Sequence, residues 1–71
     1  MEWDKKKIKM LRKVLGLTQP KFAELLNTSD VLISYWERGK RRPSNISQAA
    51  LTYLAEVRGV KKEYLVEEGI N

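Results

Sequence analysis

The sequence predicts an all-α fold, a compact bundle of five short helices. Apolar residues recur along the chain at spacings of three and four, which is the period of amphipathic helices. The four glycines fall where these patterns stop, as glycines that end helices do. No stretch shows the alternation of a β-strand. We therefore expect residues 1–71 to form a single domain with a thin core, since a chain this short buries only about 60% of its unfolded surface.

The first helix is predicted over residues 3–15. Asp4 is a suitable N-cap, because its carboxylate can accept from a free N–H of the first turn. Gly16 can end the helix in the left-handed conformation. The expected inner face of this helix consists of Ile8, Met10, Leu11, Val14 and Leu15.

A second helix is expected to begin after Thr18, whose hydroxyl can cap it. Pro20 is tolerated in the first turn, where its missing N–H would have had no partner. Residues 27–29 form a polar break, in which Asn27 can adopt the left-handed conformation that a tight corner needs. The expected inner face consists of Phe22, Ala23, Leu25 and Leu26.

The third helix is predicted over residues 30–38, with Ser29 as its cap and Gly39 as its end. Ile33 and Trp36 lie one turn apart and predict the face that packs on the domain. This spacing makes Trp36 a core residue rather than one that stacks on a base. Because only three residues separate the second and third helices, the two must cross at a steep angle.

Two further helices complete the predicted bundle. Ser44 or Ser47 starts the fourth, which ends before Gly59. A fifth, shorter helix is expected over residues 61–68, with Gly69 as its stop. The expected core stripe of the fourth helix consists of Ile46, Ala49, Ala50, Tyr53, Leu54 and Val57.

Composition narrows the function. Fourteen Lys and Arg against nine Asp and Glu give a net charge of +5, which favours a polyanionic partner such as nucleic acid or a membrane surface. The chain has no cysteine and no histidine, so it lacks a thiolate, the commonest general base and the commonest metal ligands. No apolar run approaches the roughly 20 residues that cross a bilayer. We expect a cytoplasmic protein that is not an enzyme and that needs no cofactor or metal.

Residues 18–38 have the pattern of a helix-turn-helix, a motif suited to DNA. A helix enters the major groove, about 12 Å wide, when its outward face carries short or polar side chains and its opposite face is anchored. Ile33 and Trp36 provide the anchor for the third helix. The outward side chains near its N-terminal half are the candidates for base contacts: Asp30, Val31, Ser34 and Tyr35.

Flanking residues are expected to hold this helix against the DNA backbone. Four cations within five residues follow the third helix, a density that favours phosphate contacts over a solvated loop. The predicted phosphate ligands are Gln19, Lys21, Ser29, Arg38, Lys40, Arg41 and Arg42.

Several of these residues have a structural alternative. Asp30 can accept from a cytosine amino group or simply complement the helix dipole. Val31 can reach a thymine methyl, and Tyr35 either contacts DNA or covers the core. The cations of the first helix either form a solvated face or, for some of them, contact the DNA backbone: Lys5, Lys6, Lys7, Lys9, Arg12 and Lys13.

The chain resembles the phage-repressor and Cro-like helix-turn-helix family, also called the XRE family. The resemblance covers about residues 8 to 57 and includes the signatures L-T-Q at residues 17–19 and W-E-x-G-x-R-x-P at residues 36–43. The matching residues are Leu17, Thr18, Gln19, Phe22, Ala23, Leu26, Ser29, Ile33, Ser34, Trp36, Glu37, Gly39, Arg41 and Pro43.

The resemblance implies a lambda-repressor-like fold and roles for individual residues. In the family, the residues at Gln19 and Ser29 bind phosphates, and the exposed residues of the third helix touch bases. Arg12 and Glu37 occupy positions where the family often has a partly buried ion pair with a structural role. The sequence departs from the family at Asn27, where glycine is frequent, and lacks the Asn or Gln that reads adenine at the four base-contacting positions.

The implied function is sequence-specific binding of double-stranded DNA by a transcriptional regulator, most simply a repressor. One helix reads too few base pairs, so a weak homodimer on a two-fold operator is expected. Residues 59–71 are a candidate dimerisation tail, because Trp3, Val60, Tyr64, Leu65 and Ile70 form either core or an exposed patch that pairs two copies.

Two alternatives remain open. The chain could be the antitoxin of a toxin–antitoxin pair, binding a partner protein and regulating its own gene through DNA. It could also be the DNA-binding module of a longer repressor or DNA-processing enzyme. A prokaryotic or phage origin and association with the nucleoid follow from the resemblance alone.

Overall fold

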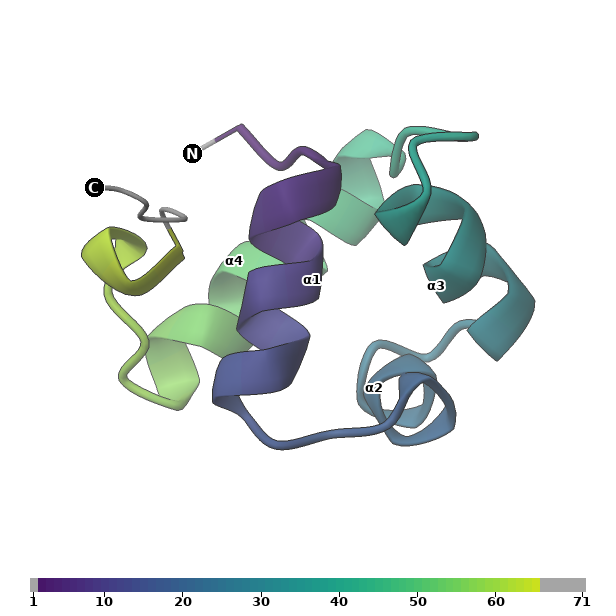
Figure 1. The fold of residues 1–71 in the computed structure, drawn as a ribbon. Coiled ribbons are helices and arrows are strands. Elements are labelled where there is room, and N and C mark those ends of the chain that lie inside the picture. Colours follow the sequence, from purple (N-terminus) through teal and green to yellow (C-terminus); the bar gives the residue numbers. More distant parts are fainter. Residues whose placement is uncertain (1, 66–71) are drawn as a thin grey trace.

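The computed structural model describes residues 2–65 and shows four α-helices followed by one short 3-10 helix (Figure 1). No β-strand occurs in this part of the chain, which confirms the all-α class. The predicted count of five helices is corrected to four α-helices plus the 3-10 turn. The helices are α1 (Lys5–Val14), α2 (Gln19–Leu25), α3 (Asp30–Glu37), α4 (Asn45–Val57) and η1 (Lys62–Leu65).

A side-chain cap begins each α-helix. Asp4, Thr18 and Ser29 accept from the backbone N–H three residues later, as predicted, and Ser44 does the same for α4. Each cap satisfies one of the N–H groups that the first turn of a helix leaves without a partner. Short polar residues in the loops thus set where the helices start.

All four α-helices end in the same way. The residue after each C-cap has positive φ, and two backbone hydrogen bonds fold back onto the last turn, the Schellman arrangement. In α3, for example, Gly39 N donates to Trp36 O at 3.1 Å and Lys40 N donates to Tyr35 O at 2.8 Å. The four positive-φ residues are Gly16, Asn27, Gly39 and Gly59.

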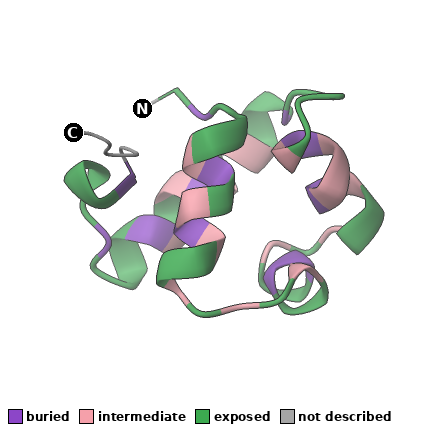
Figure 2. Cartoon of the chain, in the orientation of Figure 1, coloured by how far each residue is buried: buried purple, intermediate pink, exposed green. Residues whose placement is uncertain are grey.

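One apolar core joins the N-terminal segment, all four α-helices and η1 (Figure 2). Trp3 is 1% exposed, and its indole Nε1 donates to Thr52 Oγ1 at 2.9 Å. Val60 and Leu65 are also buried, whereas Tyr64 is 56% exposed. The structure therefore places Trp3, Val60 and Leu65 in the core. Ile70, Gly69 and the predicted helical residues 66–68 lie outside the described residues.

The inner faces of α1 and α2 are narrower than predicted. Val14 and Leu25 are each 46% exposed, so neither belongs to the core. Both side chains lie at the edge of their apolar stripe and near the end of a short helix. Ile8, Leu11, Phe22 and Ala23 carry the burial on these two helices.

The predicted core stripe of α4 is correct for Leu54, which packs against the core, and wrong for Ile46, Ala49, Tyr53 and Val57. Its buried residues are Leu51 and Ala55, while Ile46, Tyr53 and Val57 are 84%, 69% and 60% exposed. Apolar residues occur on two sides of this helix, so the period alone does not decide which side packs. The Trp3–Thr52 hydrogen bond and the burial of Leu51 orient the helix with Ile46, Tyr53 and Val57 outward.

Candidate nucleic-acid interface

Helix α3 has one face fixed in the core and one face in solvent. Ile33 and Trp36 are 0% and 2% exposed, as predicted, and α2 packs against α3. On the other side, Asp30 and Val31 are exposed, and Ser34 and Tyr35 are half-buried. The structure thus brings the four predicted base-contacting residues together on the accessible side of α3.

The corner between α2 and α3 is tight. Asn27 has φ 57°, the left-handed conformation predicted for it, and Thr28 N donates to Ala23 O at 2.9 Å. Asn tolerates this conformation better than most residues other than glycine. Ser29 Oγ then accepts from Leu32 N at 3.1 Å and starts α3. The hydroxyl hydrogen of Ser29 is not used in that bond and can be donated outward.

A partly buried ion pair ties α3 to α1. Arg12 Nε lies 2.6 Å from Glu37 Oε2, and Arg12 Nη2 lies 3.0 Å from Glu37 Oε1. The two side chains are 17% and 4% exposed. Arg12 Nη1 also donates to Leu17 O at 3.0 Å, in the loop before α2. Through Arg12, the C-terminal end of α3 is thus fixed to α1 and to the loop before α2.

Gln19 joins the same network. Its Nε2 donates to Glu37 Oε1 at 3.1 Å, so one amide hydrogen is held inside the domain. The second amide hydrogen remains available to an acceptor outside. Gln19 is the first residue of α2, where the N-terminal dipole also favours an anion. The sequence resemblance places a phosphate contact at Gln19, and the structure shows how its amide is oriented.

The predicted phosphate ligands differ in their surroundings. Arg38 lies over the Tyr35 ring, with its guanidinium carbon 5.6 Å from the ring centroid. Lys40 and Arg41 are exposed in the turn after α3. Lys21 and Arg42 each have an acidic neighbour, Glu24 and Glu2, at 3.3 Å, but all four of these side chains are 68–78% exposed. Exposed pairs of this kind are weak, so a phosphate can compete for both cations.

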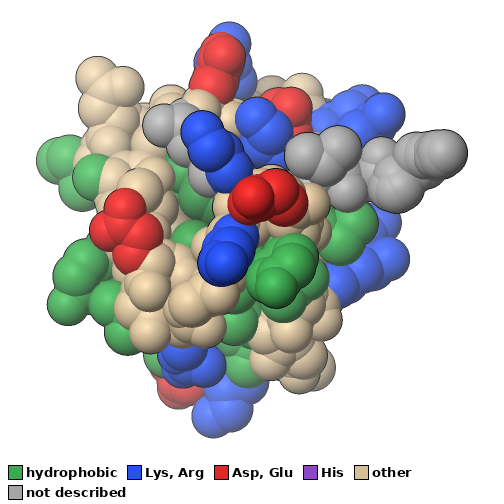
Figure 3. All heavy atoms as spheres, turned by 90° about the vertical axis from the view of Figure 1, so that its left-hand side faces the viewer, with side chains coloured by type: hydrophobic (Ala, Val, Ile, Leu, Met, Phe, Trp, Pro, Cys, Tyr) green, Lys and Arg blue, Asp and Glu red, His purple; other side chains and the backbone are tan. Residues whose placement is uncertain are grey.

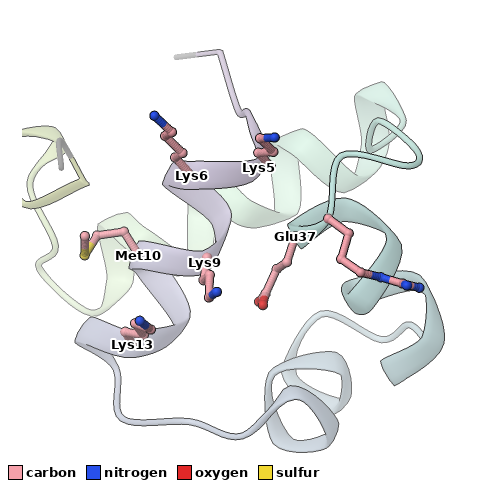
Figure 4. Close-up of a pocket in the computed structure, with 7 residues that line it drawn as sticks. Lys5, Lys6, Lys9, Met10, Lys13 and Glu37 are labelled. Atoms are coloured by element: carbon pink, nitrogen blue, oxygen red, sulfur yellow. The ribbon is translucent and has the colours of Figure 1, made fainter.

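A cationic hollow lies between α1 and the end of α3 (Figure 4). Lys5, Lys9 and Lys13 follow one another at intervals of four and share a side of α1. None of these three forms an ion pair with a described carboxylate, and Glu37 at the hollow is already held by Arg12. The sequence suggested the spacing of these lysines but not that they line one hollow with Arg38. The residues that line the hollow are Lys5, Lys6, Lys9, Met10, Lys13, Glu37 and Arg38.

The described residues contain no group of three or more acidic, histidine or cysteine side chains that could bind a metal ion. Among them, no helix is long and apolar enough to span a bilayer.

The fold and this arrangement define a helix-turn-helix protein. A family model described as helix-turn-helix matches residues 8–65. The chain therefore belongs to the XRE-type helix-turn-helix family, whose members bind specific DNA sequences and regulate transcription. No curated protein and no solved structure matched the chain.

Proposed function

We propose that the protein is a transcriptional repressor that binds a two-fold operator as a weak homodimer. One observation carries the proposal: α3 has a buried face and an accessible face, and the cations Arg38, Lys40, Arg41 and Arg42 follow it directly. Ile33 and Trp36 hold the helix, so its accessible side can enter a major groove without disturbing the core. A second copy is required because one helix reads too few base pairs for a genome.

The base-contacting side of α3 combines different chemistries. Asp30 can accept from a cytosine amino group, and the exposed methyls of Val31 can contact a thymine methyl. The hydroxyls of Ser34 and Tyr35 can donate or accept. Asp30 also lies in the first turn of α3, where it complements the helix dipole whether or not it touches a base.

The phosphate contacts surround this side of α3. Gln19 and Ser29 present a preoriented amide and hydroxyl from the start of α2 and the corner. Arg38, beside Tyr35, and the cations of the following turn provide the charge. Together the proposed phosphate ligands are Gln19, Lys21, Ser29, Arg38, Lys40, Arg41 and Arg42.

Selection of bound sequences from a random DNA pool, at two salt concentrations, tests the proposal. We expect an enriched palindrome whose half-sites are about 34 Å apart, the repeat of one helical turn. Affinity for it should fall steeply with salt, with about 0.9 in the log–log slope for each neutralised phosphate. Recovery of no preferred sequence, together with binding that is insensitive to salt, would refute DNA recognition by this face.

A reporter gene placed behind the recovered site tests the regulatory sign. Reduced expression in the presence of the protein is the result expected for a repressor. Increased expression would keep the DNA contacts and overturn the repressor assignment.

A further inference from the structure

α4 presents an apolar stripe that no described residue covers. Ile46, Tyr53 and Val57 are 84%, 69% and 60% exposed, and Ala49 between them is also exposed. At about 100° per residue these positions share one side of the helix, opposite Leu51 and Ala55 in the core. Three large apolar side chains aligned in this way form one contiguous patch rather than scattered exposure, and such a patch is a candidate interaction surface.

The same helix carries almost no charge. Glu56 is the single charged residue among the 13 of α4, in a chain where 32% of residues are charged. Figure 3 shows hydrophobic side chains gathered at the left edge of the view, where no Lys or Arg is drawn. Each copy of the chain carries a net charge of +5, so two copies repel one another at most approaches. The stripe is where they can meet with little repulsion, and its lack of cations makes it unsuited to DNA.

We propose that this stripe is a two-fold interface, at which α4 of one copy packs antiparallel against α4 of a second copy. An axis through the middle of α4 puts Ile46 opposite Val57 of the second copy, and Tyr53 opposite Ala50. A large side chain then meets a small one on both sides of the axis, and the two helix dipoles run in opposite directions. The stripe is therefore complementary to itself, which a two-fold interface requires.

The size of the stripe sets the strength of the association. Its exposed side chains offer on the order of 400 Å² per copy, about half of what each partner buries in a standard interface. Two free copies therefore associate weakly. Adjacent half-sites on DNA raise the effective concentration of one copy for the other and complete the dimer.

This last step rests on the proposed function, and the dimensions of the domain agree with it. The domain measures 32 × 26 × 22 Å, so two copies that meet side by side lie about one domain width apart. A width between 22 and 32 Å is of the same order as the roughly 34 Å between half-sites on one face of the duplex.

Two tyrosine variants test the interface. Tyr53→Lys places a cation at the centre of the stripe, whereas Tyr64→Lys changes a tyrosine that is 56% exposed in the segment predicted as a dimerisation tail. In sedimentation equilibrium without DNA, we expect the wild type and Tyr64→Lys to share one dimer dissociation constant. We expect Tyr53→Lys to dimerise at least tenfold more weakly. On DNA, it should bind a single half-site normally and lose cooperative binding to the two-fold site.

Thermal unfolding establishes that the variants fold, and Ile46→Lys provides a second disruption at the end of the stripe. Equal dimerisation of the wild type and both stripe variants overturns the proposal. Loss of dimerisation in Tyr64→Lys alone also overturns it, because the tail would then form the interface. A wild type that stays monomeric and binds both half-sites independently overturns it too, as does a different protein occupying the stripe.

The two proposals fail separately. A wild type that dimerises through the stripe but binds no DNA refutes the proposed function and leaves the interface intact. A wild type that binds half-sites but never pairs refutes the interface and leaves DNA recognition intact.

Discussion

Gln19 and Glu37 are joined by a hydrogen bond of 3.1 Å between the amide nitrogen of one and the carboxylate of the other. The same carboxylate is held by Arg12 at 2.6 and 3.0 Å. The Glu37 carboxylate therefore has two roles. It holds α3 against α1 through Arg12, and it orients the amide of Gln19 at the edge of the proposed DNA contact. Removing Arg12 and removing Gln19 should consequently have different effects.

Arg12→Ala should destabilise the fold. Glu37 is 4% exposed, so loss of the guanidinium leaves a buried carboxylate without its counter-ion. Breaking a buried pair from one side costs about 3 kcal/mol or more, a large part of the stability of a small domain. Thermal unfolding measures the loss, with Arg42→Ala as the control because its pair with Glu2 is exposed. Normal unfolding combined with weakened DNA binding would contradict a structural role for Arg12.

Gln19→Ala should weaken DNA binding and cost less stability than Arg12→Ala, because it removes one hydrogen bond to Glu37 and leaves the ion pair in place. Arg12 still neutralises Glu37 in this variant, whereas the preoriented amide is lost. A hydrogen bond to a charged acceptor contributes about 1.5 kcal/mol, so we expect the Kd for operator DNA to rise by about tenfold. Titration of labelled DNA and thermal unfolding of the same sample separate the two effects. An unchanged Kd would remove Gln19 from the DNA contact.

Gly16 and Asn27 are the positive-φ residues that end α1 and α2, and together they test how much this backbone conformation costs. Gly16 has φ 70°, and no neighbouring group lies within 4 Å of the position that a Cβ would take, so Gly16→Ala isolates the cost of positive φ. We expect a loss of about 1–2 kcal/mol in the free energy of unfolding. Asn27 has φ 57°, and Asn27→Gly should therefore cost little or even stabilise. Denaturant titration measures the free energy of unfolding of both variants. Equal losses would show that positive φ does not determine the effect of substitutions at these two positions.

The hollow beside α1 should add to the salt dependence of DNA binding. Replacing Lys9 and Lys13 with Gln removes two cations that line the same hollow as Arg38. If both contact phosphates, the log–log slope of affinity against salt should decrease by up to about 1.8. Lys61→Gln with Lys62→Gln is the control, since these exposed lysines lie at η1. The same slope in both double variants would assign the α1 lysines to a solvated face.

Val31→Ala should change which sequence is preferred without changing the salt slope. Val31 is 57% exposed on α3, and its methyl groups are suited to a thymine methyl rather than to a phosphate. We expect one position of the selected site to lose its preference, with a cost of about 1 kcal/mol on the original site. Repeating the selection with the variant measures this, and an identical site would place Val31 outside the groove.

The elements that the sequence predicted correctly depend on short-range chemistry. Asp4, Thr18 and Ser29 cap the helices that follow them, and Asn27 turns the corner, because each acts within a few residues of itself. The side of α3 that faces the core was equally predictable, since Ile33 and Trp36 are its anchoring pair. These features could be predicted because they depend on residues close in sequence and little on tertiary packing.

The failures come from contacts between distant residues. The side of α4 that packs inward is set with Trp3, which donates to Thr52 across 49 positions of sequence, and helical period could not choose between two apolar sides. For this reason the prediction placed the outward residues of α4 in the core. The same applies to the hollow, because it is formed where α1 meets the end of α3.

The burial of both Trp3 and Leu65 affects when the chain can fold during synthesis. Each is 1% exposed, and η1 packs against α1, so the core is completed by residues from opposite ends of the described chain. Residue 65 must therefore leave the ribosome before the core around Trp3 is complete. Until then the recognition helix is attached to an open core, and a nascent chain that stalls earlier exposes apolar surface to chaperones and proteases.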